Sequence, residues 1–345
     1  MLKTAIKTSV ALFITCLIVA CSEPVLPSAQ ALDADQKQLA LIPHIEVGPL
    51  TVVTGRSLLF SVPESKSDNE RELELSVFFP EQGQDYPVLF FSHGNWSTKD
   101  KYDQLITFWV SHGYVVIAPN HRDCCSMASG IFNSLRYGNF ALIEHRVKDF
   151  TFLIDHYTQL ETSYPKLKGK GDINNIALVG HSFGAFTAQQ FGGAGTYNTD
   201  DKLYHFYGDD RVKAIVAISP PGPMFEEITA QSWQNLSTPT FVSTGTWDVD
   251  SHFFTEWQLH LMSFETALPH DKYALVTQGA DHYLGNLICR PERDVAPQQD
   301  ALTMLNASST TFLDAYLKGD DKAKSFLQSA QLEQLTGGFS VLRYK

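Results

Sequence analysis

Continuous apolar runs and helical stripes alternate along most of the chain. Two runs, 86–94 and 114–120, are apolar almost throughout, as in strands covered on both faces. Further strands are expected at 176–180, 212–219, 238–245 and 272–279. A seventh, residues 72–80, alternates like a half-exposed strand. Helices are expected between these strands at 101–113, 140–160, 185–191, 252–266 and 303–317.

This alternation of strands and helices predicts an α/β protein with a mainly parallel central sheet and helices on both faces. We expect one domain over residues 46–345, with loops or lid pieces at 121–138, 193–210 and 284–302. Two of these segments follow the carboxyl end of a strand, where open α/β sheets place their ligand sites.

The N-terminus has the pattern of an export signal. Two lysines precede a short apolar stretch at 10–20, which is too short to span a bilayer comfortably. Residues 17–21, Leu-Ile-Val-Ala-Cys, resemble a bacterial lipobox. We therefore expect a signal peptide at 1–20, a lipidated Cys21 and a tether over 21–45. A plain secretory signal is the alternative.

The lipobox resemblance also implies a location. Ser22 follows Cys21, which by resemblance to sorted lipoproteins points to the outer membrane of a bacterial envelope. Acyl chains on the cysteine would hold the protein there, since each buried CH₂ contributes about 0.8 kcal/mol.

Charge narrows the range of partners. The net charge is −12 and no block of Lys or Arg occurs. Because binding to nucleic acid needs a basic face, a nucleic-acid partner is not expected.

The sequence Gly-His-Ser-Phe-Gly at 180–184 joins an apolar strand to a helix. A phosphate loop would need a lysine, and a dinucleotide fingerprint would need Gly-x-Gly-x-x-Gly. The remaining readings are an ordinary turn and a nucleophile elbow, in which Ser182 is held above the sheet and flanking glycines allow close approach of strand and helix. The placement favours the elbow.

A nucleophilic serine requires a base oriented by a carboxylate, in the order serine, acid, histidine in this fold. His282, in "LVTQGADHYLG", follows a strand end and is the preferred base. His252 and His260 fall in a predicted helix, and His270 precedes a strand.

The acid is expected in "TFVSTGTWDVD", which leaves another strand. Asp248 is preferred and Asp250 is the alternative. Asp281 is interpreted as a solvated neighbour of His282.

An oxyanion hole completes the expected site. One donor is the backbone N–H of Phe183, directly after the nucleophile, and the other is the N–H of Asn95 in the loop after a strand. His93 and His181 are interpreted as structural. Trp96 either lines the site or is an ordinary exposed loop residue.

Three cysteines belong to the expected domain. Because an exported domain permits disulfides, Cys124 or Cys125 could bond Cys289, with three free thiols as the alternative. A zinc site is not expected, because no Cys-x-x-Cys or paired histidine spacing accompanies them.

Five motifs together carry a family resemblance: "FFSHGNW", "GYVVIAPNHRD", "GHSFGA", "GTWD" and "GADH". Their order resembles α/β-hydrolases of the dienelactone-hydrolase-like group, and within it platelet-activating-factor acetylhydrolases and related bacterial esterases. The resemblance spans roughly residues 71–283. It implies Ser182 as nucleophile, Asp248 as acid, His282 as base and the N–H groups of Asn95 and Phe183 as oxyanion donors.

The segment Cys124-Cys125 and residues 127–137 match no pattern of that family, so the resemblance implies nothing about pocket or lid. The expected activity is hydrolysis of carboxylic esters, with short acyl or lipid-like substrates and no metal or organic cofactor. A serine peptidase or thioesterase would use the same triad. A catalytically silent envelope binding protein is the alternative from another class. The sequence predicts no oligomeric state.

Overall fold

A computed structural model describes residues 31–63, 70–250 and 254–345. Among these residues a sheet of nine strands runs in the order β1-β2-β4-β3-β5-β8-β9-β10-β11. The strands from β4 to β10 are parallel, and β1, β2 and β11 are antiparallel to their neighbours. The bounds are β1 Val52–Pro63, β2 Glu70–Pro80, β3 Tyr86–Ser92, β4 Val115–Pro119, β5 Gly171–His181, β8 Val212–Ile218, β9 Thr240–Gly245, β10 Lys272–Thr277 and β11 Ser340–Tyr344. The predicted α/β fold with a mainly parallel sheet is confirmed.

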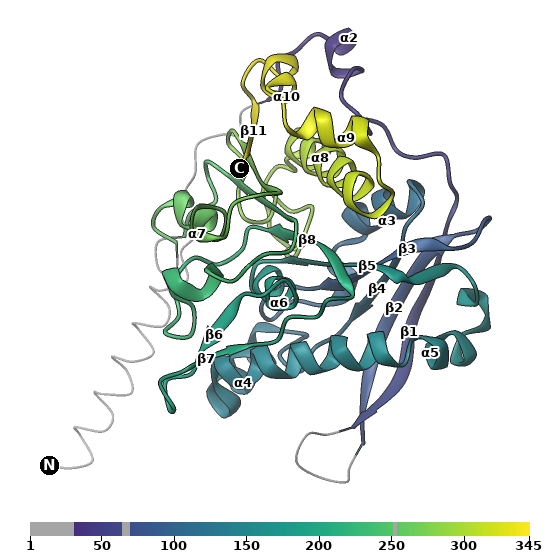
Figure 1. The fold of residues 1–345 in the computed structure, drawn as a ribbon, viewed down its shortest axis with the longest axis vertical. Coiled ribbons are helices and arrows are strands. Elements are labelled where there is room, and N and C mark those ends of the chain that lie inside the picture. Colours follow the sequence, from purple (N-terminus) through teal and green to yellow (C-terminus); the bar gives the residue numbers. More distant parts are fainter. Residues whose placement is uncertain (1–30, 64–69, 251–253) are drawn as a thin grey trace, which may run out of the picture.

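Helices cover both faces of this sheet (Figure 1). On one side lie α3 (Asp103–Ser111), α8 (Gln299–Leu317), α9 (Asp321–Leu327) and α10 (Gln331–Leu335); on the other lie α4 (Met127–Asp155), α5 (Tyr157–Ser163), α6 (Phe183–Phe191) and α7 (Met262–Thr266). Shorter elements are α2 (Gln36–Leu39), the hairpin of β6 (Gly195–Tyr197) and β7 (Tyr204–Phe206), and the 3₁₀ turns η1 (Lys99–Lys101), η2 (Pro165–Leu167), η3 (Ala230–Trp233) and η4 (Trp257–Leu261).

Strand β3 shows why the central strands are apolar throughout. Leu89 and Phe91 pack into the cluster on the α3 and α8 side, while Val88 and Phe90 pack into the cluster on the α4 and α5 side. Successive side chains of a strand point to opposite faces, so a strand covered on both sides is apolar at every position.

Two segments expected as loops contain regular structure. Helix α4 begins at Met127 rather than near 140, with Ser126 as its cap and a kink at Gly138, where φ is 75°. Its first half was missed because the large apolar residues there face solvent instead of forming a stripe toward the core: Met127, Ile131, Phe132 and Leu135. The segment 193–210 contains the hairpin of β6 and β7.

The expected tether is partly folded. The signal peptide 1–20, Cys21 and the tether up to residue 30 lie outside the described residues. From residue 31 on, however, the chain contacts the domain: the Leu32 N–H donates to Asp300, and Leu39 and Ile42 are buried in the core. The predicted domain boundary at residue 46 is therefore too late. None of the helices in 31–63, 70–250 and 254–345 has the length and apolar character needed to cross a bilayer.

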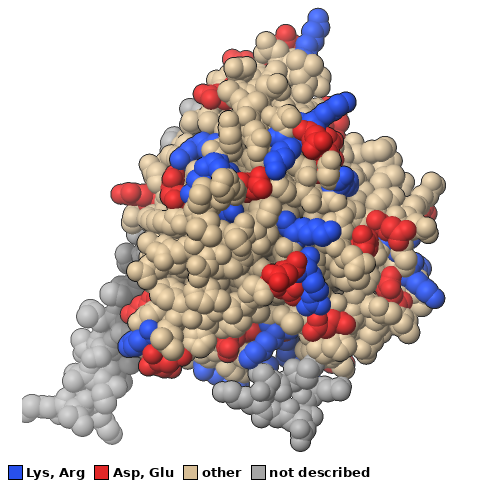
Figure 2. Space-filling model, in the orientation of Figure 1, with Lys and Arg blue, Asp and Glu red and all other residues tan. Residues whose placement is uncertain are grey.

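Charged side chains of both signs are interspersed on the face shown in Figure 2, and Lys and Arg form no single patch on that face.

Candidate active site

Ser182 lies on a sharp turn between β5 and α6. Its backbone is in a left-handed region, with φ 55° and ψ −125°. A Cβ atom on Gly180 would lie 2.2 Å from the Gly184 carbonyl oxygen, and one on Gly184 would lie 2.1 Å from the Ser92 oxygen. These approaches leave room only for glycine, so the local geometry is that of a nucleophile elbow.

The preferred acid and base meet beside this turn. Asp248 follows β9, and its N–H donates to the Gly245 oxygen at 3.0 Å. His282 follows β10, and its Nδ1 lies 2.7 Å from Asp248 Oδ1. Thr244 Oγ1 donates to the other carboxylate oxygen at 2.9 Å. This arrangement fixes Nδ1–H of His282 toward the acid and leaves Nε2 as the basic nitrogen.

The alternatives for acid and base are placed elsewhere. The backbone of Asp250 pairs with that of Phe254 in a local bridge. His270 is exposed on a turn, and His252 lies outside the described residues. Asp281 is buried rather than solvated, which corrects its interpretation: its Oδ1 accepts from the N–H groups of Tyr283 and Gly285 at 2.9 and 2.8 Å. It thus holds the turn that carries His282.

A second histidine, His260, contacts the same carboxylate. It lies on η4, and its Nε2 is 2.9 Å from Asp248 Oδ1. The pattern of apolar positions placed it in a helix and gave no functional reason for it. A lone histidine between two leucines in "WQLHLM" was the only signal in the sequence.

Asp248, His260 and His282 are also the described cluster whose ligand atoms lie close enough, within 4.8 Å, to hold a metal ion. A metal would displace the proton that joins His282 Nδ1 to Asp248. The hydrogen-bond distance of 2.7 Å between them instead fits a triad.

Burial and these charges set the ionisation of the three groups. Burial lowers the pKa of His282 below its usual value, and Asp248 offsets part of this effect. Burial opposes the charge on Asp248, but His260 and His282 outweigh it and hold the pKa of Asp248 well below its usual range. A neutral His282 beside an ionised carboxylate is the state that a general base requires.

The two expected oxyanion donors lie on the elbow and on the loop after β3. Within the described part of the chain, neither the N–H of Asn95 nor that of Phe183 donates to a protein acceptor. Both are therefore available to a ligand oxygen. The close approach of Gly184 to the Ser92 carbonyl brings their two segments together.

Arg146 of α4 contacts both the loop after β3 and the elbow. Its Nη1 donates to the His93 carbonyl oxygen at 2.7 Å, and its guanidinium lies over the Phe183 ring at 4.9 Å. Its Nε and Nη2 donate to both oxygens of Asp123, at 3.0 and 2.6 Å. Arg146 and Asp123 are fully buried. One bidentate ion pair thus supports both expected oxyanion donors.

His181 links the β3 loop to the base. The N–H of Gly94 donates to the Tyr102 hydroxyl at 2.9 Å, and that hydroxyl lies 3.1 Å from His181 Nδ1. His181 Nε2 is 2.8 Å from the His282 carbonyl oxygen. Burial lowers the pKa of His181 to about 4, so this ring is neutral. His93 is likewise buried and bonded locally, with Nδ1 at 2.7 Å from the Gly94 oxygen.

Comparison with known proteins shows which enzymes the chain is similar to. The family model described as Chlorophyllase matches residues 54–220. Platelet-activating factor acetylhydrolase from Cavia porcellus is 22% identical over 275 residues, covering 70% of this chain and 59% of that protein. The Bos taurus enzyme of the same name is 28% identical over 142 residues, covering 31% of this chain and 32% of that protein. Over these ranges the chain is similar to chlorophyllases and platelet-activating factor acetylhydrolases, and its sheet is consistent with an α/β-hydrolase fold.

The matched range contains the elbow and the β3 loop but ends before the acid and base. The similarity therefore reaches the segments of Ser182 and Asn95, whereas Asp248 and His282 rest on the geometry described above. The chain spans about three fifths of the Cavia porcellus relative and a third of the Bos taurus one. The finer dienelactone-hydrolase-like grouping and the lipoprotein assignment stay predictions.

The disulfide differs from the expectation. Cys124 is joined to its neighbour Cys125, and Cys289 is a free buried thiol. Cys289 packs under the β3 loop, 3.3 Å from the position a Cβ on Gly94 would take. Cys125 is exposed. The two neighbouring cysteines are therefore bonded to each other and not to Cys289.

The Trp96 side chain packs against the first half of α4. Its indole N–H lies 3.3 Å from Ser134 Oγ, and a Cβ on Gly130 would lie 2.0 Å from its ring. The tryptophan thus joins the β3 loop to the segment that was expected as a lid.

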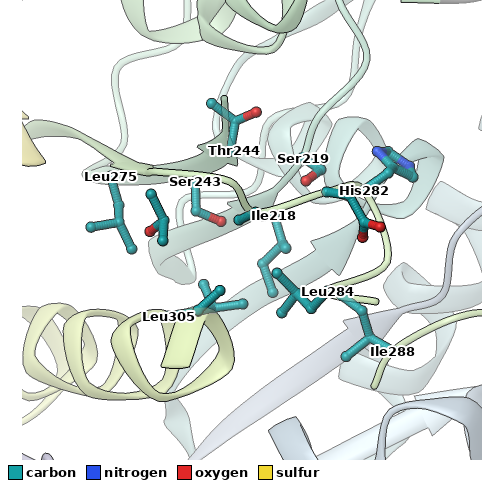
Figure 3. Close-up of a pocket in the computed structure, with 14 residues that line it drawn as sticks. Ile218, Ser219, Ser243, Thr244, Leu275, His282, Leu284, Ile288 and Leu305 are labelled. Carbon is teal, nitrogen blue, oxygen red and sulfur yellow. The ribbon is translucent and has the colours of Figure 1, made fainter. Parts of the chain in front are cut away.

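A small cavity lies next to His282, at the carboxyl ends of β8, β9 and β10 (Figure 3). Its apolar wall includes Leu275, Leu284, Ile288 and Leu305, and the His282 side chain is at its edge. Ser182 is not among its lining residues. This cavity therefore adjoins the base without offering a place for a carbonyl attacked by Ser182.

Proposed function

We propose that the protein hydrolyses carboxylic esters through an acyl-enzyme. The observation that carries the proposal is the 2.7 Å contact between His282 Nδ1 and Asp248 Oδ1 beside a serine in left-handed elbow geometry. The family relationship to esterases supports it.

In the proposed reaction, Ser182 Oγ attacks the ester carbonyl while His282 Nε2 takes the hydroxyl proton. Asp248 holds the imidazole in the required tautomer and stabilises the imidazolium that forms. The N–H groups of Asn95 and Phe183 bind the oxyanion, a term that mutagenesis of other hydrolases puts at about 3–4 kcal/mol per donor.

The imidazolium then protonates the leaving alcohol. A water molecule, deprotonated by the same imidazole, attacks the acyl-enzyme and releases the acid and the free serine. The residues assigned to this cycle supply its acid, base and nucleophile. No metal or organic cofactor enters the proposal.

We propose short acyl esters as the first substrate class, and lipid-like esters as the second. The named relatives are acetylhydrolases, which by name remove a two-carbon acyl group, and this supports the first class. A thioesterase or peptidase would use the same residues, so substrate panels have to include those bonds.

The test is release of p-nitrophenol from acetate, butyrate, octanoate and palmitate esters. The signal-free protein is compared with Ser182→Ala and with Ser163→Ala, a control on the exposed end of α5. Activity that is lost only in Ser182→Ala supports the proposal, and the chain-length optimum bounds the acyl pocket. Equal, slow rates for wild type and Ser182→Ala would refute it in favour of a silent binding protein.

We further propose that the chain is a lipoprotein anchored through Cys21 to the bacterial envelope, in the outer membrane. The support is the sequence of residues 17–21 and the small residue before the cysteine. Radiolabelled palmitate fed to expressing cells should label the wild type and not Cys21→Ser. Equal labelling of both would contradict the anchor, and secretion of an unlabelled protein would favour a plain signal.

A further inference from the structure

Two oxygen atoms lie close to the two ring nitrogens of His260. Its Nδ1 lies 2.7 Å from the Pro220 carbonyl oxygen, and its Nε2 lies 2.9 Å from Asp248 Oδ1. A carbonyl oxygen only accepts, so Nδ1 carries a hydrogen. Among the described residues Nε2 makes no hydrogen bond of good geometry, and its contact with Asp248 is an ion-pair distance. A bare nitrogen lone pair this close to an ionised carboxylate is repelled, so a proton on Nε2 is favoured as well. Both ring nitrogens protonated make an imidazolium.

The surroundings favour the ionised form of Asp248 over a proton on the acid. Asp248 Oδ1 also receives Nδ1–H of His282, and Oδ2 receives the Thr244 hydroxyl. A carboxylate that accepts several hydrogen bonds is stabilised as the anion. In agreement, burial opposes the charge on His260, but Asp248 outweighs it and raises the pKa of His260.

We propose that His260 is a positioning residue of this site: a buried imidazolium that pairs with Asp248 and thereby lowers the basicity of His282. The proposal rests on the triad of the proposed function and deepens it. It gives Asp248 two cationic partners, one permanent and one that appears only during the reaction.

The described groups that face this ring can be named. From the β9 loop comes Asp248, from the β10 loop comes His282 with its ring centroid at 5.6 Å, and from the elbow comes the neutral His181. The ring of Phe254 lies against it at 4.5 Å and carries no charge. When His260 is charged, its positive charge balances the negative charge of Asp248. A proton on His282 then adds a buried positive charge that no anion balances.

This balance has a consequence for pH dependence. A like charge a few ångströms away disfavours the protonated form of His282, typically by a pKa unit or more. The base should therefore stay neutral, and active, at lower pH than it would beside Asp248 alone. Removing the charge of His260 should raise the pKa of His282.

The experiment is the pH profile of kcat/KM for ester hydrolysis in the wild type and in His260→Gln. Glutamine keeps N–H donors and removes the charge. We expect the midpoint of the acid limb to rise by about one pH unit. His270→Gln, on an exposed turn, is the matched control and should leave the midpoint unchanged. An unshifted limb in active, folded His260→Gln would overturn the proposal.

A second measurement needs neither the variant nor activity. In the wild type labelled with ¹⁵N-histidine, both ring nitrogens of His260 should show imidazolium shifts at pH 8. The ring would be identified by its hydrogen bond to Pro220. A neutral ring at that pH, or one stoichiometric metal ion in the purified protein, would overturn the proposal. If the wild type hydrolyses no ester, the proposed function fails while this spectrum still decides the charge of His260.

Discussion

Replacing Arg146 by Met separates folding from positioning at the candidate site. Arg146 and Asp123 form a fully buried bidentate pair, and the remaining guanidinium nitrogen holds the His93 carbonyl oxygen at 2.7 Å. Methionine fills much of the same volume but donates no hydrogen bond. The carboxylate of Asp123 would then be buried without its partner.

The expected loss of stability follows from that orphaned charge. Removing one member of a buried ion pair costs about 3–5 kcal/mol in the free energy of unfolding. The loss should depend on pH. Arg146 outweighs burial and holds the pKa of Asp123 at about 2 in the wild type. Without Arg146 burial raises this pKa, so Asp123 takes up a proton on mild acidification. The difference in unfolding free energy between wild type and Arg146→Met should therefore shrink as the pH falls from 8 toward 5.

The expected loss of activity has a different cause. The β3 loop and the Phe183 ring lose a common support, so the two oxyanion donors lose their fixed separation. A misplaced donor costs up to what a missing one costs, about 10²–10³ in kcat. We expect a fall of one to two orders of magnitude in kcat, with KM changed much less.

A double variant separates the two effects. Asp123→Leu together with Arg146→Met removes both charges, and such replacements of buried pairs are often neutral or stabilising. Unfolding by urea should show recovered stability, while p-nitrophenyl acetate turnover stays low because nothing holds the His93 oxygen. Arg211→Met is the control, since the Arg211 side chain is exposed and the loss of its ion pairs should cost about 1 kcal/mol. Wild-type kcat in the stable double variant would refute the positioning role of Arg146.

Four further outcomes are expected. Asp248→Asn should lower kcat by about 10⁴ through the wrong tautomer, whereas Asp250→Asn should change it little; the reverse order would exchange the two acids. The acid limb of wild-type kcat/KM should lie below pH 6.5, because burial lowers the pKa of His282 and activity needs its neutral form; a midpoint above 7 would contradict this. Thiol titration of unfolded, unreduced protein without residues 1–21 should find one thiol, Cys289, and no thiol would contradict the vicinal pairing. Deleting residues 31–45 should lower the melting temperature by several degrees, because buried leucine and isoleucine are lost; an unchanged value would restore the tether boundary.

That the candidate triad residues lie on neighbouring loops was predictable, because consecutive strands of a parallel sheet end at the same edge. Ser182, Asp248 and His282 each follow a buried strand, and the carboxyl ends of parallel strands lie along one edge. Pattern and spacing were therefore enough to predict which loops meet there, and the choice of Asp248 and His282 stays a prediction.

Supporting residues were not predictable in the same way. Arg146 lies in the middle of a helix and His260 in a short 3₁₀ turn, at positions that no motif marks. Their roles depend on which way a buried side chain points, and periodicity reports only that a position is covered. The predicted disulfide to Cys289 was wrong for a similar reason, since cysteine spacing carries no information about the distance between two loops.

The described site thus has two sets of residues: those that would touch the substrate, and buried residues that hold the first set in place. The residues that would touch the substrate come from strand ends, and the fold alone brings them together. The residues beneath them, Arg146 and His260, are buried charges that act through the N–H groups of the β3 loop and through Asp248. A buried charge is costly unless its partner is held in place, so each of these residues fixes its partner as firmly as the fold fixes the triad. Substitutions of Arg146 or His260 should therefore change the rate and pH dependence of the proposed reaction, although the groups that would touch the substrate are all still present.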